Sequence, residues 1–412
     1  MRVLYLHQYF NTPQTSGSTR SYEMARRLVA AGHQVTMITS SASLGDTWAP
    51  SDGWHSHDLE GIHLEVLRVS YSNAMPFNQR IKAFVQFALG ASWHVRKFGA
   101  DVVFATSTPL TIIIPGLAAR IWHRIPLVFE VRDLWPELPI AVGALRNPLL
   151  KWAALALEWI AYHASAHVVA LSPGMAAGVM RCGIPASKVT IIPNSCDVQL
   201  FDVPPETGEW VRKRLGLRSG QPLIVYTGTF GLINGVGYLV KVAEAMRAIA
   251  PDVSFLLVGH GAEFDQVMAQ AAQADVLNKT LWIWPPLPKA QVPALLAATT
   301  VATSLCIHLE PTWNNSANKF FDALAAGKPV AINYGGWQAD LLDESGAGIV
   351  LPPDDPVEAA QCLAEFVHDP VRLQNAAAAA RDLAYRVFNR DLLYTRLEQV
   401  LLDVVQKQKA WR

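Results

Sequence analysis

The first part of the chain alternates between short apolar runs and segments with a helical repeat. Val3–His7 is an apolar run of strand length, and the polar stretch Asn11–Ser18 separates it from a segment whose apolar residues recur at spacings of three and four: Ala25, Leu28 and Val29. This spacing predicts an amphipathic helix. Gly32 ends the repeat, and Val35–Thr39 is a second apolar run. A strand, a helix and a strand in this order predict a βαβ unit, and therefore a parallel sheet.

The same alternation begins again at Pro222. Leu223–Tyr226 is strand-like, Gly228–Gly237 is a glycine-rich loop, and Tyr238–Ile249 has a helical repeat before the apolar run Ser254–Val258. A chain of 412 residues exceeds the usual limit of a single core. The two βαβ openings therefore predict an α/β fold with two doubly wound, Rossmann-like parallel-sheet domains in tandem.

Further apolar runs extend both predicted sheets. They are Val102–Ala105, Leu127–Glu130, Val168–Leu171 and Val189–Ile192 in the first domain, and Leu281–Ile283, Val301–Ser304 and Val330–Ile332 in the second. Because ligands bind at the carboxyl ends of parallel strands, we expect the two domains to face one interdomain cleft.

The domain boundaries follow from composition. We expect a first domain at residues 1–200 and a second at 201–385, with a hinge at Pro204-Pro205 in the Pro-, Glu- and Gly-rich segment Phe201–Gly220. The pattern from Asn375 to Gln408 predicts helix, and residues 386–412 are expected to form a C-terminal helix that packs back on the first domain.

The composition is that of a globular protein with large cores, since 51% of residues are hydrophobic and 17% are charged. No apolar run reaches the length of a membrane-spanning helix. The N-terminal Arg-Val-Leu-Tyr-Leu enters a strand directly, so no secretory signal is expected. The four cysteines have neither metal-ligand nor redox spacing, and they predict reduced thiols in a cytoplasmic protein: Cys182, Cys196, Cys306 and Cys362.

The net charge is zero, but the distribution is uneven. Between Glu65 and Glu130 the only acid is Asp101, whereas this stretch holds Arg68, Arg80, Lys82, Arg96, Lys97, Arg120 and Arg124, interleaved with Phe77, Phe84, Phe87, Trp93, Phe98 and Trp122. Basic residues among aromatics suit an anionic membrane surface, where rings insert and cations meet headgroups. Nucleic acid, or a core helix with a solvated basic face, would explain the same pattern.

Residues 312–333 are the most informative segment of the chain. A polar stretch from Asn314 to Lys319 opens a predicted helix, Gly327 closes it, and the strand Val330–Ile332 follows. Helix openings bind phosphate readily because their N–H groups are unpaired. Lys319 in the first turn and Asp322 one turn later add a cation for phosphate and a carboxylate for sugar hydroxyls. A nucleotide-sugar pocket is one interpretation, and an ordinary capped helix is the other.

Three glycine-containing turns follow predicted strands and are further candidates for contact with a ligand. They are Ser16-Gly17-Ser18, Gly228-Thr229-Phe230-Gly231 and Gly259-His260-Gly261. Glycine lets the backbone approach a ligand closely, although many glycines after strands only make turns. None of the three matches the dinucleotide fingerprint or the P-loop lysine pattern.

A charged loop, Val131–Glu137, follows the predicted strand that ends at Glu130. Arg132 and Asp133 could hold sugar hydroxyls or supply a base for an acceptor alcohol, and a surface salt-bridge loop is the alternative. His163 and His167 lie four apart without a carboxylate at ligand spacing, so we infer no metal site. The absence of a Gly-x-Ser-x-Gly elbow or of a readable Cys–His pair gives hydrolysis by a protein nucleophile no support.

Nearly the whole chain resembles the retaining nucleotide-sugar glycosyltransferases of family four, which have the GT-B fold, and most closely their WbuB-like branch in bacterial surface polysaccharide assembly. The resemblance is carried by several motifs together: His7-Gln8-Tyr9-Phe10, Gly17-Ser18-Thr19-Arg20, Gly32-His33-Gln34-Val35-Thr36, Asp133-Leu134-Trp135-Pro136, Ile192-Pro193-Asn194-Ser195-Cys196-Asp197, Gly228-Thr229-Phe230-Gly231, Ser316-Ala317-Asn318-Lys319-Phe320-Phe321-Asp322 and Ala325-Ala326-Gly327-Lys328-Pro329.

The resemblance implies a donor nucleotide on the second domain and an acceptor on the first. The family hallmark is a Glu, seven residues and a second Glu. Here Asp322 takes the second position and would hold ribose hydroxyls, whereas Asn314 takes the first and carries no charge. The backbone amides around Ser316, Ala317 and Asn318 would meet the diphosphate.

The resemblance also exposes two departures. Many relatives place an Arg and a Lys after the glycine-rich strand to bind diphosphate, but this chain has Thr229 and Asn234 there. We expect Lys319 to supply the missing charge, with Arg132 as a second candidate. Asp133 would orient the donor sugar or the acceptor hydroxyl, since the family mechanism is front-face attack without a protein nucleophile.

The function that the resemblance implies is transfer of an amino or deoxy sugar from a nucleoside diphosphate donor, UDP by resemblance, to a polyprenyl-diphosphate-linked saccharide. The product would enter O-antigen or capsule synthesis, as part of lipopolysaccharide biosynthesis, at the cytoplasmic face of the inner membrane. We expect no metal or other cofactor and no nucleic acid partner. A sugar-nucleotide epimerase of the same fold and a non-catalytic two-domain sugar-binding protein are the alternatives.

Overall fold

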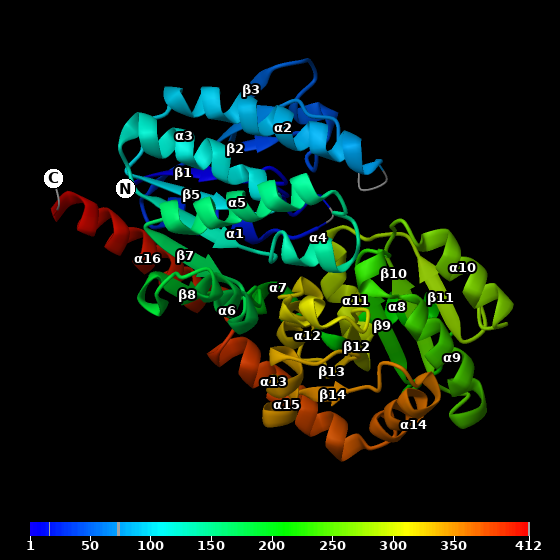
Figure 1. Ribbon diagram of the computed structural model, residues 1–412. Coiled ribbons are helices and arrows are strands. Elements are labelled where there is room, and N and C mark those ends of the chain that lie inside the picture. Colours follow the sequence, from blue (N-terminus) through cyan, green and yellow to red (C-terminus); the bar gives the residue numbers. More distant parts are fainter. Residues whose placement is uncertain (16, 72–74, 411–412) are drawn as a thin grey trace. The chain divides into compact units, whose positions relative to one another are not determined.

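In the computed structural model of the chain, the described residues are 1–15, 17–71 and 75–410, so that Ser16 of the first glycine turn and the side chain of Phe77 lie outside the description. The chain divides into two compact units (Figure 1). The first unit consists of Met1–Pro193 with Asp391–Arg412, and the second is Asn194–Arg390.

Among its described residues, the first unit holds an eight-stranded sheet in the order β3-β4-β2-β1-β5-β6-β7-β8. The strands are β1 Arg2–Leu6, β2 Gln34–Ser40, β3 Trp54–Leu59, β4 Ile62–Leu67, β5 Val102–Thr106, β6 Leu127–Val131, β7 His167–Ala170 and β8 Val189–Ile191. All neighbours are parallel except β3, which pairs antiparallel with β4 at the edge. The sequence pattern did not predict β3 and β4. The His-Ser-His-Asp run of β3 is half-exposed and polar, so it lacks the apolar pattern of a buried strand.

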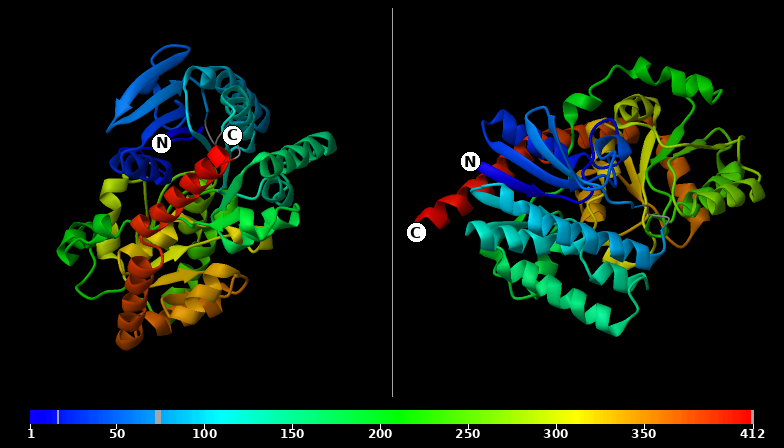
Figure 2. Two further views of the ribbon diagram at one scale, coloured as in Figure 1. Left: turned by 90° about the vertical axis from the view of Figure 1, so that its left-hand side faces the viewer. Right: turned by 90° about the horizontal axis from the view of Figure 1, so that it is seen from above.

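Helices cover both faces of the first sheet (Figures 1 and 2). They are α1 Arg20–Ala30, α2 Phe77–His94, α3 Ile113–His123, α4 Glu137–Ala141, α5 Pro148–Ala164 and α6 Pro173–Arg181. Alternate residues of β1 enter opposite cores, as the two-residue repeat of a strand requires. Leu4 and Leu6 meet α2, α3, α5 and α6, whereas Val3 and Tyr5 meet α1 and the C-terminal helix α16 (Arg390–Ala410).

The C-terminal helix packs on the first unit, as the sequence predicts. Its buried residues Leu393, Leu397 and Leu401 join the core that contains Leu28 of α1. Arg27 Nε also donates to Asp391 Oδ1 at 2.7 Å. The predicted helical pattern from Asn375 to Gln408 is confirmed, and it corresponds to two helices. The helix breaks at residues 387–389, between α15 (Pro370–Arg386) and α16, because Phe388 turns into the core of the second unit.

Among its described residues, the second unit holds a six-stranded sheet in the order β11-β10-β9-β12-β13-β14, with every pair parallel. The strands are β9 Leu223–Thr227, β10 Ser254–Val258, β11 Leu281–Trp284, β12 Val301–Ser304, β13 Val330–Ile332 and β14 Gly348–Val350. The sequence predicted these strands except β14, whose three residues carry too little pattern.

The helices of the second unit again cover both faces of its sheet (Figure 1). They are α7 Val198–Phe201, α8 Glu209–Arg214, α9 Gly237–Ile249, α10 Phe264–Gln273, α11 Val292–Ala298, α12 Asn318–Ala325, α13 Trp337–Ser345, α14 Pro356–Val367 and α15. The predicted linker, Phe201–Gly220, is not an extended hinge. It contains α8, whose Val211 is fully buried and whose Arg212 donates to Ala298 O at 2.8 Å.

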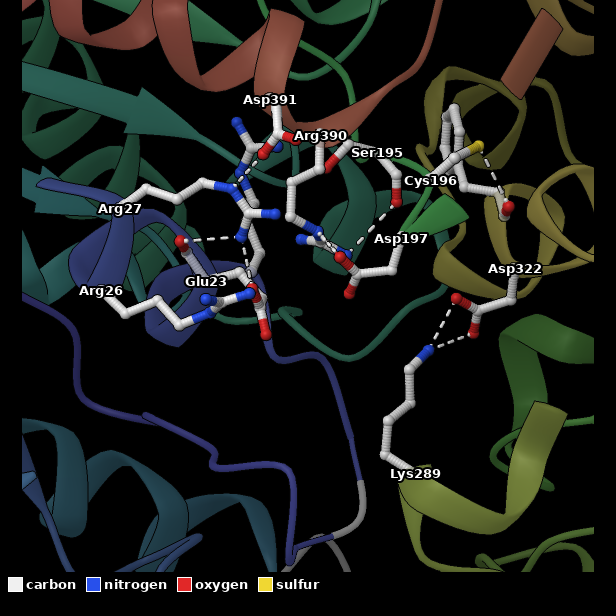
Figure 3. A network of polar contacts seen from close by, with 12 residues as sticks. Glu23, Arg26, Arg27, Ser195, Cys196, Asp197, Lys289, Asp322, Arg390 and Asp391 are labelled. Atoms are coloured by element: carbon white, nitrogen blue, oxygen red, sulfur yellow. Dashed lines mark hydrogen bonds and ion pairs between the residues drawn. The ribbon is translucent and has the colours of Figure 1, made fainter. Parts of the chain in front are cut away.

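The compact units divide at residues 193/194, whereas the sequence placed the boundary at 200/201. The physical reason is the pairing of residues 195–197 with residues 388–390 (Figure 3). Cys196 N donates to Phe388 O at 2.7 Å, and Arg390 Nε donates to Asp197 Oδ1 at 2.9 Å. These hydrogen bonds hold the segment after Pro193 in the second unit.

Glu158 provides a test of the core of the first unit. It lies on the buried face of α5, where burial raises its pKa to about 7 even though Tyr162 donates a hydrogen bond to it at 3.1 Å. A glutamate in the unfolded chain has a pKa of about 4.3. The folded chain therefore binds the proton more tightly, and this stabilisation is lost as pH rises through about 7.

We expect Glu158→Gln to have a higher thermal unfolding midpoint than the wild type at pH about 8, and an equal midpoint only below pH about 4, where the carboxyl is protonated in the unfolded chain as well. Thermal unfolding followed by circular dichroism across this pH range measures the difference. The exposed Glu358 supplies the control, and Glu358→Gln should track the wild type. If the unfolding midpoints of Glu158→Gln and the wild type changed in parallel with pH, the Glu158 carboxyl would not be the cause of the pH-dependent stability.

Candidate functional site

The ammonium of Lys319, in the first turn of α12, lies at the carboxyl end of β9. It donates to Tyr226 Oη at 2.9 Å and to Asn234 Oδ1 at 3.0 Å. It also lies 4.4 Å from the centre of the Tyr226 ring. Strand, loop and helix thus converge on one cation, and Asn234 occupies a position where the family resemblance leads one to expect a cation.

Both hydrogen-bond partners of Lys319 are neutral groups. Among the residues that the structure describes, no carboxylate forms a salt bridge with it. Burial lowers the pKa of Lys319 to about 8, because desolvation disfavours the ammonium, and the nearby Cys306 opposes this shift only in part. A desolvated cation without an acid partner is strongly attracted to an anion of suitable size.

Two glycine turns pack against each other beside this lysine. Gly228 and Gly259 have positive φ angles of 146° and 157°. A Cβ on Gly259 would lie 1.8 Å from Gly228 O, so only glycine fits there. A Cβ on Gly228 would come within 3.1 Å of Lys319 Nζ. The structure therefore brings together the predicted residues Gly228, Gly259 and Lys319, with Thr229 O accepting a hydrogen bond from Tyr226 at 2.9 Å.

The polar stretch before α12 is held by hydrogen bonds within the second unit. Asn194 N donates to Ser316 Oγ at 3.0 Å, and the Asn194 side chain donates to Ser316 O. The Ser316 hydroxyl thus already accepts a bond from the protein. Asn314 ends a short 3₁₀ helix, Glu310–Asn314, and Ala317 precedes the first residue of α12, Asn318, which is exposed. Their roles toward a diphosphate stay predictions, as does that of Gly231, whose carbonyl accepts from Asn234 N at 2.9 Å.

Asp322 faces a lysine that sequence reasoning missed (Figure 3). Lys289 Nζ donates to both carboxylate oxygens of Asp322 at 2.6 Å, and each side chain is 12% exposed. Lys289 begins a short 3₁₀ helix, Lys289–Gln291, that precedes α11, and nothing in its own sequence neighbourhood marks it as a partner of α12. The ribose role of Asp322 stays a prediction, and in this structure Lys289 balances its charge.

The first unit has a second polar cluster where β1, β5 and β6 end. Arg132 follows β6, and its guanidinium donates to His7 Nε2 at 3.2 Å and to Ser18 Oγ at 3.1 Å. A guanidinium can only donate, so Nε2 is the acceptor and the ring proton of His7 lies on Nδ1. That buried nitrogen has no hydrogen-bond partner among the described residues. Burial and Arg132 hold the pKa of His7 well below its usual value, so the ring is neutral.

Asp133 lies next to Arg132 in this cluster. It accepts a hydrogen bond from Thr108 Oγ1 at 3.1 Å, and burial raises its pKa above the ordinary value although Arg132 and Thr108 oppose the shift. The predicted residues Ser18, Arg132 and Asp133 therefore belong to one cluster. Gly17, with a φ of 127°, shapes the turn before Ser18, and its added Cβ would lie 3.2 Å from the Asn11 side chain.

A fully buried ion pair, Arg20 with Glu130, lies beside this cluster. Arg20 of α1 donates to Glu130 Oε1 from Nε at 3.0 Å and from Nη2 at 2.8 Å. The other Glu130 oxygen accepts from Thr106 Oγ1 at 2.6 Å. Arg20 also donates to Ile192 O and Pro193 O, so it joins β6, α1 and the last segment of the unit's main body.

Sequence reasoning missed several residues of these clusters as site candidates. His7 lies directly after a strand, Thr108 two residues after one, and Arg20 at a helix start, and these positions were the available signal. Tyr226 appeared only as an apolar strand residue, and Lys289 gave no local signal. No group of three or more potential metal ligands gathers within residues 1–15, 17–71 and 75–410.

The Lys289–Asp322 pair is expected to contribute strongly to stability. Replacing one partner leaves the other charge buried and unpaired, which costs about 3–5 kcal/mol. Lys289→Met should therefore lower the urea midpoint of the second unit markedly. The double variant Lys289→Met with Asp322→Leu should recover most of the loss because it leaves no charge behind. Equal midpoints for Lys289→Met and the wild type would contradict the pair's structural role.

Comparisons with known proteins follow the division into two units. The family model described as Glycosyltransferase Family 4 matches residues 17–200, and that of Glycosyl transferases group 1 matches residues 209–383. The chain is 24% identical over 289 residues to the probable glycosyltransferase WbjE of Pseudomonas aeruginosa, which covers 69% of this chain and 70% of that protein. It is also 24% identical to the 2-deoxystreptamine glucosyltransferase of Streptomyces kanamyceticus, and there the match spans about half the length of the relative (49%) and 47% of this chain.

Solved structures share the fold over almost the whole chain. HepE of Anabaena, solved with UDP and glucose, superimposes with a TM-score of 0.72 at 18% identity, over 98% of this chain and 100% of HepE. WaaG, described as a glycosyltransferase involved in lipopolysaccharide biosynthesis, gives 0.71 at 16% identity, over 97% and 99%. These likenesses establish the GT-B fold. The chain is therefore a nucleotide-sugar-using glycosyltransferase, in which residues 17–200 are similar to the Glycosyltransferase Family 4 model and residues 209–383 to the Glycosyl transferases group 1 model.

Proposed function

We propose that this enzyme transfers an amino or deoxy sugar from UDP to a polyprenyl-diphosphate-linked saccharide, with retention of anomeric configuration, in bacterial O-antigen or capsule synthesis. We place it in the WbuB-like branch and at the cytoplasmic face of the inner membrane. The probable glycosyltransferase WbjE and the lipopolysaccharide enzyme WaaG support this setting. The bound UDP-glucose and UDP of HepE support the donor class.

The observation that supports the proposed donor site is the ammonium of Lys319, which has no acidic partner among the described residues. Its neutral partners, Tyr226 and Asn234, position the charge without neutralising it. A diphosphate bound there would gain a charge-assisted hydrogen bond and would relieve the desolvated cation. The amides around Ser316, Ala317 and Asn318 would add N–H donors at the beginning of α12. Asp322 would take the ribose hydroxyls in exchange for part of its contact with Lys289.

The chemical step needs stabilisation of the departing diphosphate more than a nucleophile from the protein. In front-face transfer, the bond from the anomeric carbon to the phosphate oxygen breaks as the acceptor oxygen bonds to the same face, and the acceptor proton passes to the leaving phosphate. Lys319 would stabilise the negative charge that develops there. Asp133 and the Nδ1–H of His7 supply an acceptor and a donor that can orient sugar or acceptor hydroxyls.

The exposed side chains of α2 support docking of a lipid-linked acceptor on the first domain. Leu89 and Trp93 are 64% and 70% exposed, although both lie on a helix whose other face is core. The Arg96 guanidinium lies 4.1 Å from the centre of the Trp93 ring and 4.0 Å from that of Trp122. A guanidinium between two exposed indoles suits a layer of anionic headgroups. Within the described part of the chain, no helix is both long enough and apolar enough to span a bilayer.

Lys319→Met should weaken UDP binding about 10- to 100-fold, because a hydrogen bond to a charged group is worth about 1.5–3 kcal/mol. For the wild type, UDP affinity should decrease as pH rises through about 8, since the free ammonium then loses its proton. The variant should lose this pH dependence. Isothermal titration calorimetry measures both effects, and Lys241→Met, at an exposed lysine of α9, is the matched control. Unchanged affinity in Lys319→Met would remove this lysine from the donor site.

Turnover with a panel of UDP-sugars and lipid-linked saccharides tests the reaction itself. We expect the product linkage, followed by NMR, to keep the donor's anomeric configuration. Asp133→Asn should lower kcat about 100-fold or more, the cost of a misplaced reacting group. Glu137→Gln is the control in the same segment, because Glu137 is exposed and paired with Arg181 at 2.9 Å. Conversion of the donor without any acceptor would instead indicate an epimerase.

A further inference from the structure

Helix α5 carries an apolar stripe on its outward face. Leu149, Trp152, Leu155 and Trp159 recur at helical spacings of three and four, Ile160 lies beside Trp159, and all five are exposed. Leu149 is 76% exposed and Trp152 72%, the exposures expected of lysine or glutamate on a surface helix. An amphipathic pattern normally marks the buried face of a helix. Here the pattern points away from the sheet.

The fold holds α5 firmly in this orientation. Asn147 caps its start by accepting from the N–H groups of Leu149 and Leu150 at 2.9 and 3.3 Å, and Pro148 occupies the first position. The inward face buries Ala161 and Tyr162 in the core that also contains α2, α3 and α6. The stripe is therefore not a core face that has turned outward by rotation of the helix.

The polar groups of α5 leave its outer face free of acid. The only acid in Pro148–Ala164 is Glu158, which is buried against Tyr162. The nearby Glu137 is paired with Arg181. His163 stacks on Trp159 with ring centres 4.0 Å apart, and Lys151 and Arg146 are the basic residues near the helix start. Two exposed indoles, aliphatic side chains and flanking cations are the composition of a helix that lies in a lipid interface.

The length of α5 also fits a helix that lies in the interface rather than one that spans it. Its 17 residues extend about 25 Å, which is less than the roughly 30 Å of a hydrocarbon core. A second copy of this chain is the competing occupant of such a stripe. The outward face of α5 carries basic residues near its start and no acid. Two copies of this face would therefore repel each other, and a lipid surface is the favoured occupant of the stripe.

We propose that α5 is a membrane anchor that lies in the plane of the bilayer interface, with Leu149, Trp152, Leu155 and Trp159 inserted among the acyl chains of phospholipids. The inference rests on the membrane association that forms part of the proposed function, and it assigns the insertion to a helix outside the basic stretch between Glu65 and Glu130. Insertion would bring the first domain to the lipid surface that holds a lipid-linked acceptor. Because apolar burial drives it, this attachment persists when salt screens the basic residues.

The test compares the full-length protein with the triple variant Leu149→Gln, Trp152→Gln and Leu155→Gln in co-sedimentation with vesicles of phosphatidylcholine and phosphatidylglycerol. At an ionic strength of about 1 M, where charges are screened beyond about 3 Å, the triple variant should partition at least about ten-fold more weakly than the wild type. The matched control, Val357→Gln, Val371→Gln and Tyr385→Gln, changes exposed apolar residues of the second unit and should bind like the wild type.

The outcomes separate this inference from the proposed function. Wild-type partitioning by the triple variant would overturn the role of α5 and leave membrane association intact. Failure of the wild type to bind any vesicle would overturn both the anchor and the membrane part of the proposed function. Dimerisation of the wild type that the triple variant loses, without vesicle binding, would identify a second copy as the occupant and also overturn the anchor. Thermal midpoints and turnover on a short-chain acceptor, equal in all three proteins, establish that the variants are folded.

Discussion

A parallel sheet buried on both faces leaves room for polar chemistry only where its strands end, and this constraint organises both domains. The strands of each sheet are nearly continuous apolar runs with helices on either side. Charged side chains therefore appear at the carboxyl ends, where the backbone leaves the sheet. His7, Arg132 and Asp133 follow strands of the first sheet, and Lys319 reaches the end of β9 in the second.

The charges at these positions are not all balanced within the protein. Glu130 is paired with Arg20, and Asp322 with Lys289, so each of these buried carboxylates has a cation in contact. Within the described part of the chain, the hydrogen-bond partners of Lys319 are a hydroxyl and an amide. The protein thus keeps one desolvated cation at a strand end of its group 1 domain, and this arrangement favours an anionic ligand. Thr229 and Asn234 carry no charge, so the positive charge beside them comes from Lys319.

The surface of the first domain departs from the ordinary pattern in a related way. Helices α2 and α5 each have a core face and a second apolar stripe that faces outward. A helix that is apolar on opposite sides meets two apolar environments, one of them the protein core.

Much of the fold follows from local sequence patterns, because alternating apolar runs and helical repeats report on each element separately. They predict the two βαβ openings, most strands and the helix with Lys319 at its start. They fail where the pattern is weak or mixed, as in β3, β4 and β14, and in the segment Phe201–Gly220, whose prolines and glycines hide the short helix α8.

The tertiary structure decides the partners. Lys289 and Asp322 are 33 residues apart, Tyr226 and Lys319 are 93 apart, and His7 and Arg132 are 125 apart. No local pattern encodes such pairs, since they arise only when the sheet brings distant strand ends together. The outward stripe of α5 follows the same rule. The sequence by itself determined that Pro148–Ala164 is rich in apolar residues, and only the packing of Tyr162 and Ala161 against the core decided which of them face outward, because that packing fixes the rotation of the helix.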